Sequence, residues 1–194
     1  MSAMTTRTVI DAGDGGYCPP FATAKAWRRF RRKVVETAGC SIWIGAIGDD
    51  GYPRFHDPAY GDEDAGADRR SDIVRASRWR WWAEYGPIPA GRKVLHDCDV
   101  QLCVRLDHLL AGTQSQNLLM AAHRDRTARV AAWGTARRDA GDRRSKYEQS
   151  LAIRDAVVDA VAAGQRDRHA LARIVAAVLD AGSPLAGQDA LFDL

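Results

Sequence analysis

Apolar positions in the N-terminal part of the chain recur with the period of a helix. Over residues 21–37, Trp27, Phe30, Val34 and Val35 lean to one side, while arginines occupy the other side. We therefore expect one amphipathic helix here, with its aromatic side packed against the core.

Short strands are predicted next. Residues 41–45 (Ser-Ile-Trp-Ile-Gly) form a short apolar run, and Tyr52–Phe55 would be the returning strand after the turn dipeptide Asp50-Gly51. Residues 73–85 then place aromatic side chains at helical spacing, and the Gly-Pro-Ile-Pro run that follows ends this helix.

The segment 93–124 has the order strand, loop, strand, helix. Lys93–His96 is a short strand that leads into a cysteine-bearing loop, and residues 109–113 form a second strand. Thr113 followed by Gln116 is a capping-box pattern, so a helix should begin near Ser115.

Two amphipathic helices are predicted in the C-terminal part, over Glu148–Ala163 and Arg166–Ala181, separated by Gly164. Such a pair is compatible with a helix-turn-helix that reads a DNA site. Because the second helix is mostly apolar, a packing or dimerising arm is an equally good interpretation.

Composition narrows the class of protein. The 194 residues are 46% hydrophobic and 27% charged, which is enough apolar material for one core and a smaller appendage. The sequence has no apolar run long enough to cross a membrane and no secretion-signal pattern at its start. We therefore expect a soluble protein that acts in the cytoplasm, in a bacterial host cell or encoded by a phage.

The net charge of +3 hides a segregated pattern. Residues 25–33 carry six positive charges and no acid, whereas residues 49–68 hold seven acids against the single Arg54. Further basic runs cover residues 69–80 and 124–146. Arginines interleaved with aromatic residues suit contacts to phosphates, although a solvated helix face is the alternative.

Three metal-ligating side chains are crowded into eleven residues of one loop. Cys98, Cys103 and His108 need one more thiolate to complete a tetrahedral zinc site, and Cys40 is the natural fourth ligand, ahead of Cys18. Such a zinc would be structural, because protein side chains fill all four positions. Buried thiols beside a core histidine are the alternative.

His96 and Asn117 flank this loop in the strand, loop, strand, helix order. The imidazole of His96 would be held at a strand end, and Asn117 would emerge from the first turn of the following helix. An imidazole base and an amide oxygen brought together are suited to general-base chemistry at a Mg2+ ion.

The same residues carry a family resemblance. His96-Asp-Cys98, Cys103, Asp-His108-Leu and Gly-Thr-Gln-Ser-Gln-Asn117, preceded by Cys40-Ser-Ile-Trp, resemble phage-type HNH endonucleases. The zinc and active-site spacing also resembles the His-Cys box homing endonucleases of the ββα-metal (His-Me finger) superfamily. The likeness covers residues 38–124.

This resemblance implies a role for each position. His96 would be the general base, Asn117 would hold a catalytic Mg2+ (or Mn2+), and Cys40, Cys98, Cys103 and His108 would bind the structural zinc. Arg54 is the first choice for the arginine that steadies the scissile phosphate, ahead of Arg70 and Arg78. The substrate would be double-stranded DNA, nicked or cut.

One departure from the family pattern favours a second interpretation. Many HNH enzymes place an acid before the base histidine, and here that residue is Leu95. A catalytically inactive, zinc-stabilised DNA-binding protein of the same fold is therefore the alternative. A zinc hydrolase of small molecules is a third hypothesis, but it needs an open metal position.

The predicted architecture is α+β: a zinc-stabilised ββα-metal core with short antiparallel strands, flanked by N- and C-terminal helices. We expect a flexible leader over residues 1–20, the nuclease domain over 21–135, and a helical arm over 136–194 that binds DNA or makes a homodimer.

Overall fold

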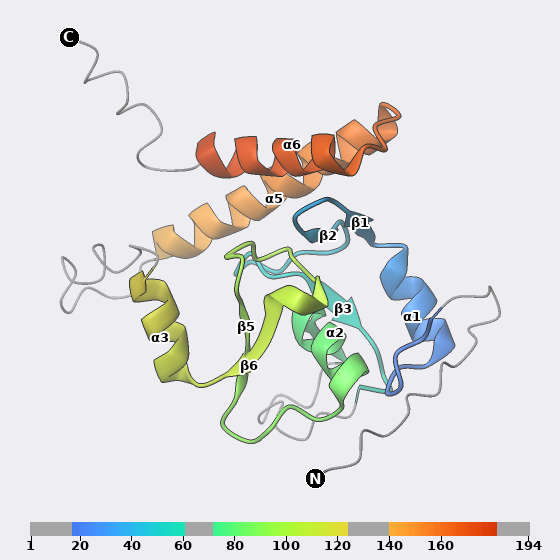
Figure 1. Cartoon of the computed structure of the whole chain (residues 1–194), viewed down its shortest axis with the longest axis vertical. Helices are drawn as coiled ribbons and strands as arrows, with labels where there is room; N and C mark the ends of the chain where they lie inside the picture. The colour runs from blue at the N-terminus through green and yellow to red at the C-terminus, as the bar shows by residue number, and fades with distance from the viewer. Residues whose placement is uncertain (1–16, 61–71, 124–139, 182–194) are drawn as a thin grey trace.

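A computed structural model describes residues 17–60, 72–123 and 140–181 (Figure 1). Short antiparallel strand pairs alternate with helices, so the α+β class predicted from the sequence is confirmed. The elements are α1 (Ala24–Arg31), β1 (Val34–Glu36), β2 (Ser41–Trp43), β3 (Arg54–His56), β4 (Ile73–Arg75), α2 (Ala76–Tyr85), β5 (Lys93–His96), the 3-10 turn η1 (Leu106–His108), β6 (Leu109–Gly112), α3 (Gln114–His123), α5 (Ala140–Ala162) and α6 (Arg168–Ala181).

The helix predicted over residues 21–37 is shorter than expected. α1 begins after Thr23, whose hydroxyl accepts the N–H of Ala26 at 3.1 Å, and it ends at Arg31. Val34 and Val35 lie instead on β1, which pairs with β2. Two adjacent β-branched residues favour an extended backbone, and cross-strand pairing with Trp43 decides the outcome.

The helix predicted over residues 73–85 is also divided. Ile73–Arg75 form β4, whose Val74 is buried while its two neighbours are exposed, and α2 begins at Ala76. This alternation has the period of a strand, but three residues are too few for it to stand out beside the helical spacing of the tryptophans. Gly86, with φ of 85°, ends α2 where the sequence predicted.

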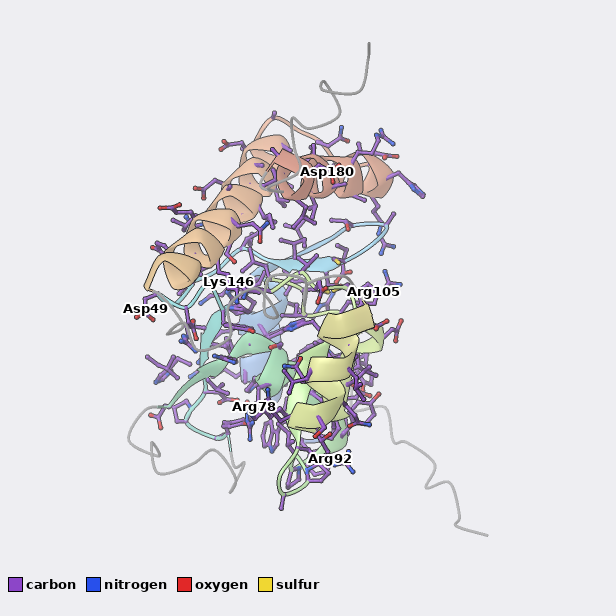
Figure 2. All side chains as sticks on the ribbon, turned by 90° about the vertical axis from the view of Figure 1, so that its left-hand side faces the viewer. Asp49, Arg78, Arg92, Arg105, Lys146 and Asp180 are labelled. Carbon is purple, nitrogen blue, oxygen red and sulfur yellow. The ribbon has the colours of Figure 1, made fainter. Side chains whose placement is uncertain are left out.

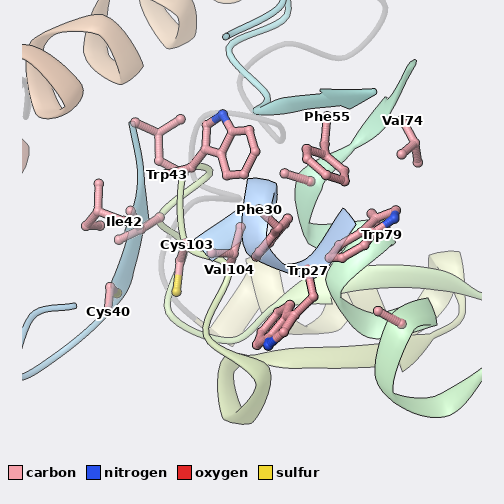
Figure 3. Packing of buried hydrophobic residues seen from close by; sticks show 14 of the residues in the cluster. Trp27, Phe30, Cys40, Ile42, Trp43, Phe55, Val74, Trp79, Cys103 and Val104 are labelled. Carbon is pink, nitrogen blue, oxygen red and sulfur yellow. The ribbon is translucent and has the colours of Figure 1, made fainter. Parts of the chain in front are cut away.

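An aromatic core joins α1, β2, β3 and α2 (Figure 3). The Trp79 ring centroid lies 4.6 Å from that of Phe30 and 4.6 Å from that of Phe55, and Phe30 lies 5.1 Å from Trp43. All four side chains are almost fully buried. These stacked, edge-to-face and tilted ring contacts add to the free energy gained by burial alone.

The hairpin of β5 and β6 is followed directly by α3, as the sequence predicts. His96 pairs with Leu109 at the end of the hairpin that carries the cysteine loop. At the other end the capping box forms: the Gln116 N–H donates to Thr113 Oγ1 at 3.1 Å, and the Thr113 N–H donates to Gln116 Oε1 at 2.8 Å.

The helices α5 and α6 pack against each other and against the rest of the described structure (Figure 1). Ile153 and Val157 from α5 and Val175 from α6 belong to the same buried cluster as the aromatic core. Gly51, with φ of 77°, lets α5 approach closely, because a Cβ atom there would lie 2.7 Å from the Lys146 carbonyl oxygen.

Several predicted segments lie partly outside the described residues. These are the leader, the acidic loop, the basic run after residue 124 and the boundary near residue 135. Of the leader's described residues, the Tyr17 hydroxyl donates to Glu84 Oε1 at 2.6 Å, and Cys18 is buried. Among the residues that are described, no helix combines the length and apolarity needed to span a bilayer.

The buried bond between Trp79 and Asp57 can be tested by substitution. Trp79 Nε1–H donates to Asp57 Oδ2 at 2.6 Å inside the core. Trp79→Phe leaves that carboxylate oxygen without its donor, so the free energy of unfolding should fall by about 1–3 kcal/mol more than in Trp82→Phe on the same helix. Urea unfolding measures the difference, and equal losses in the two variants would contradict it.

Candidate active site and metal centre

The four predicted zinc ligands come together in space. One ligand atom from each of Cys40, Cys98, Cys103 and His108 lies within 4.8 Å of the other three. His108 Nδ1 is 3.7 Å from Cys40 Sγ and 3.5 Å from Cys103 Sγ, so this nitrogen faces the sulfurs. Sulfur atoms bound to one tetrahedral zinc lie about 3.8 Å apart, so the spacing and the donor set both suit a metal such as zinc.

Backbone hydrogen bonds hold the two halves of this cluster together. The hydroxyl of Thr37 accepts the N–H of Cys40 at 2.9 Å, which fixes the turn before β2. β2 then bonds to the cysteine loop: the Trp43 N–H donates to the Leu102 carbonyl at 2.9 Å, and the Val104 N–H donates to the Ser41 carbonyl at 2.8 Å. The turn that bears Cys40 is therefore joined to the later loop by the chain itself.

The thiols of the cluster cannot all ionise without a cation. The adjacent sulfurs of Cys40 and Cys98, together with burial, raise the pKa of the Cys103 thiol well above its ordinary value. Hydrogen bonds from Cys103 and Cys40 lower the pKa of Cys98. One thiolate shared among three sulfurs is thus favoured, and a divalent metal supplies the charge that lets the others deprotonate.

Cys18 is separate from this cluster. Its thiol is buried and faces backbone oxygens, lying 3.6 Å from the Ala22 carbonyl and 3.7 Å from that of Pro19. The choice of Cys40 over Cys18 as the fourth member of the cluster agrees with this geometry.

His96 stands at the end of β5, beside the cluster. Its Nε2 lies 3.0 Å from the backbone carbonyl oxygen of Cys103. A carbonyl only accepts, so this contact assigns the ring proton to Nε2 and leaves Nδ1 of the neutral ring as a proton acceptor. Burial lowers the pKa of the imidazole and favours this neutral form.

Asn117 lies in the first turns of α3, where its backbone N–H donates to the Thr113 carbonyl at 3.0 Å. Asn117 is half-buried. The structure therefore places His96 at the end of β5 and Asn117 on α3, the helix that follows the β5–β6 hairpin, and their convergence on one metal ion stays a prediction.

The three candidate arginines differ in their surroundings. Arg54 Nη2 donates to Asp50 Oδ1 at 2.9 Å, and its guanidinium packs against Gly48, where a Cβ atom would collide with it. Arg78 Nε donates to the Tyr60 hydroxyl at 3.0 Å. Arg70 lies outside the described residues.

Sequence reasoning did not single out Arg75 or Tyr52 as site residues. Arg75 Nη2 donates to Asp50 Oδ2 at 2.9 Å, and its Cζ lies 3.8 Å from the centre of the Tyr52 ring. That ring in turn lies 6.4 Å from the ring of His96. The sequence signals for this group were general ones: Arg75 belongs to the basic run over residues 69–80, and Tyr52 begins the predicted strand Tyr52–Phe55.

Comparison with known proteins identifies the segment that contains this site. Residues 74–119 match the family described as HNH endonuclease. This segment of the chain is similar to HNH endonuclease domains. The HNH segment runs from Val74 through α2, the hairpin and the cysteine loop into α3, and it includes both His96 and Asn117. The resemblance predicted from the sequence is thereby confirmed over this segment.

One similar protein is Protein 7.7 of Escherichia phage T7, which is 30% identical over 78 residues. The aligned region is 40% of this chain and 51% of the phage protein, so this chain spans about half the length of that relative. No solved structure matches the chain.

Loss of one cluster thiol should release the metal. Loss of a side chain that hydrogen-bonds to a metal ligand typically lowers metal affinity by roughly 10–100-fold. Cys103→Ser removes a ligand itself, so zinc affinity should fall by more than this. The Tm should fall as well, because metal binding contributes to folding. Cys18→Ser, which removes a buried thiol outside the cluster, should keep one zinc ion per chain. Elemental analysis and thermal unfolding measure both, and equal zinc content in the two variants would contradict the assignment.

Proposed function

We propose that this chain is a metal-dependent endonuclease that hydrolyses phosphodiester bonds of double-stranded DNA. The HNH family match over residues 74–119 supports a nuclease, and such a domain implies a nucleic-acid partner. The observation that carries the proposal is the contact between His96 Nε2 and the Cys103 carbonyl, which assigns the ring proton to Nε2 and makes Nδ1 the basic nitrogen of the neutral ring.

In this proposal each predicted residue keeps its role. His96 accepts a proton from the attacking water through Nδ1, the amide oxygen of Asn117 is a ligand of Mg2+ (or Mn2+), and Arg54 contacts the phosphate. When bound, the divalent ion stabilises the charge on the phosphate and the leaving 3′ oxygen.

The Cys3His cluster has a structural role in the proposal. All four of its positions are protein side chains, so a zinc bound there would leave no place for water. Its effect on the reaction is indirect: a rigid cysteine loop fixes the Cys103 carbonyl, and that carbonyl orients the base.

Cationic side chains around the site support a DNA partner. Figure 2, which looks at the side of the molecule that carries α3, labels the cationic residues Arg92, Arg105 and Lys146 on this side. The segment 25–33, which includes most of α1, carries four arginines and two lysines, of which only Arg29 is not exposed, and α1 lies on the other side of the molecule from α3 (Figure 1). Each phosphate neutralised by such a side chain adds affinity that falls with salt.

Leu95 favours the second candidate, an inactive DNA-binding protein of the same fold. Its side chain is buried and faces Gly112 across the hairpin, so the position before His96 offers no side-chain oxygen to a metal. This protein would bind DNA in a salt-sensitive way and leave the strands intact.

Removal of the base distinguishes the two candidates. With Mg2+ present, wild type should convert supercoiled plasmid to nicked or linear forms, and His96→Ala should slow this by about 10²–10⁴-fold. His169→Ala, an exposed histidine on α6, is the control and should cleave at the wild-type rate. Binding without cleavage by wild type would select the inactive candidate.

The metal role of Asn117 has its own test. Asn117→Ala should need at least roughly tenfold more Mg2+ for half-maximal cleavage, because an oxygen ligand is lost, whereas Asn117→Asp keeps one. Ser115→Ala, in the exposed first turn of α3, is the control. An unchanged Mg2+ requirement in Asn117→Ala would remove this residue from the metal site.

A further inference from the structure

The hairpin of β3 and β4 presents two arginines on one face. Arg54 and Arg75 are direct cross-strand partners. Their neighbours Phe55 and Val74 are also partners, and both are buried in the aromatic core. Because side chains alternate along a strand, the two arginines project from the opposite face of the hairpin, away from that core.

One carboxylate holds both guanidinium groups. Asp50 Oδ1 accepts from Arg54 Nη2 at 2.9 Å, and Asp50 Oδ2 accepts from Arg75 Nη2 at 2.9 Å. Oδ1 also accepts the backbone N–H of Tyr52 at 3.1 Å. Each guanidinium has five N–H donors, so the pair keeps unused donors and a net positive charge after binding Asp50.

The ring of Tyr52 places Arg75 near the proposed base. Arg75 Cζ stacks 3.8 Å from the centre of this ring, and the ring centre is 6.4 Å from that of His96. Arg75, Tyr52 and His96 therefore form a continuous row across the junction of two hairpins that are separate sheets in the fold.

Exposure differs between the two arginines. The Arg75 side chain is 45% exposed, whereas that of Arg54 is 29% exposed and packs against Gly48. A phosphate arriving beside His96 would therefore meet Arg75 with fewer groups to displace. Arg54 keeps its proposed phosphate contact, but it is the less accessible of the two arginines and also holds Asp50.

We propose that Arg75 is a phosphate-binding residue of the nuclease site, and that Asp50 and Tyr52 are positioning residues that hold its guanidinium beside His96. The proposal rests on the endonuclease function proposed above and extends it. A fixed guanidinium donates two hydrogen bonds to the phosphate oxygens, and these strengthen as negative charge accumulates on them during attack by water. Its main effect is therefore on the rate of cleavage rather than on binding.

Single-turnover kinetics on a duplex, with protein in excess, test the role of Arg75. Arg75→Ala should reduce the cleavage rate by roughly 10²–10³-fold and weaken Kd by less than about tenfold, and Arg75→Lys should recover part of the rate. The matched control is Arg154→Ala, which removes an arginine of α5 that is ion-paired to Asp155 at 2.8 Å. Equal rates in Arg75→Ala and Arg154→Ala would overturn the proposal.

A binding measurement keeps the test independent of catalysis. In the His96→Ala background, Arg75→Ala should reduce the slope of log K against log salt by about one, as expected for one lost phosphate contact. An unchanged slope would overturn the proposal even if wild type failed to cleave. Absence of cleavage by wild type with a reduced slope would refute the endonuclease function but leave the phosphate contact standing.

Asp50→Asn separates positioning from simple structural support. The substitution keeps the shape of the side chain and removes its charge, so both arginines become more available to DNA. We expect unchanged or tighter DNA binding together with cleavage at least roughly tenfold slower, because the guanidinium is no longer fixed. Parallel loss of binding, cleavage and Tm would instead indicate that Asp50 only stabilises the fold, and would overturn its positioning role.

Discussion

Cys103 takes part in three interactions at once, and the rest of the site depends on them. Its sulfur belongs to the Cys3His cluster, its backbone pairs with Ile42 of β2, and its carbonyl oxygen contacts Nε2 of His96. The cluster, the strand that follows Cys40 and the proposed base thus share one residue. A change in the cluster, in the pairing with β2 or in the contact with His96 would therefore alter the other two, because all three are made by atoms of Cys103.

The parts of the site that are local in sequence could be predicted from the sequence. Cys98, Cys103 and His108 lie within eleven residues, so their spacing alone indicates a shared ligand cluster. The capping box at Thr113 is local in the same way. The choice of Cys40 was less constrained, and it agrees with the structure because β2 bonds directly to the cysteine loop.

What the sequence could not show depends on pairing between distant segments. Val34 and Val35 follow a helical pattern, and only their pairing with β2 places them in a strand. Arg75 meets Arg54 through a cross-strand register that spans a long excursion of the chain, and no spacing rule predicts that register. The bonds of Asp50 to both arginines could not be predicted either, because the dipeptide Asp50-Gly51 indicates only a turn.

The contact between α6 and the turn before Cys40 has a consequence for synthesis of the protein. The Ala38 N–H donates to the Arg168 carbonyl at 2.9 Å, and Arg168 Nη2 donates to the carbonyl of Thr37, 131 residues earlier in the chain. A nascent chain on the ribosome therefore carries the cysteine loop and His96 long before this support for the turn emerges. Since contacts between such distant residues form late, the centre reaches its final form only after the segment that contains Arg168 has been synthesised.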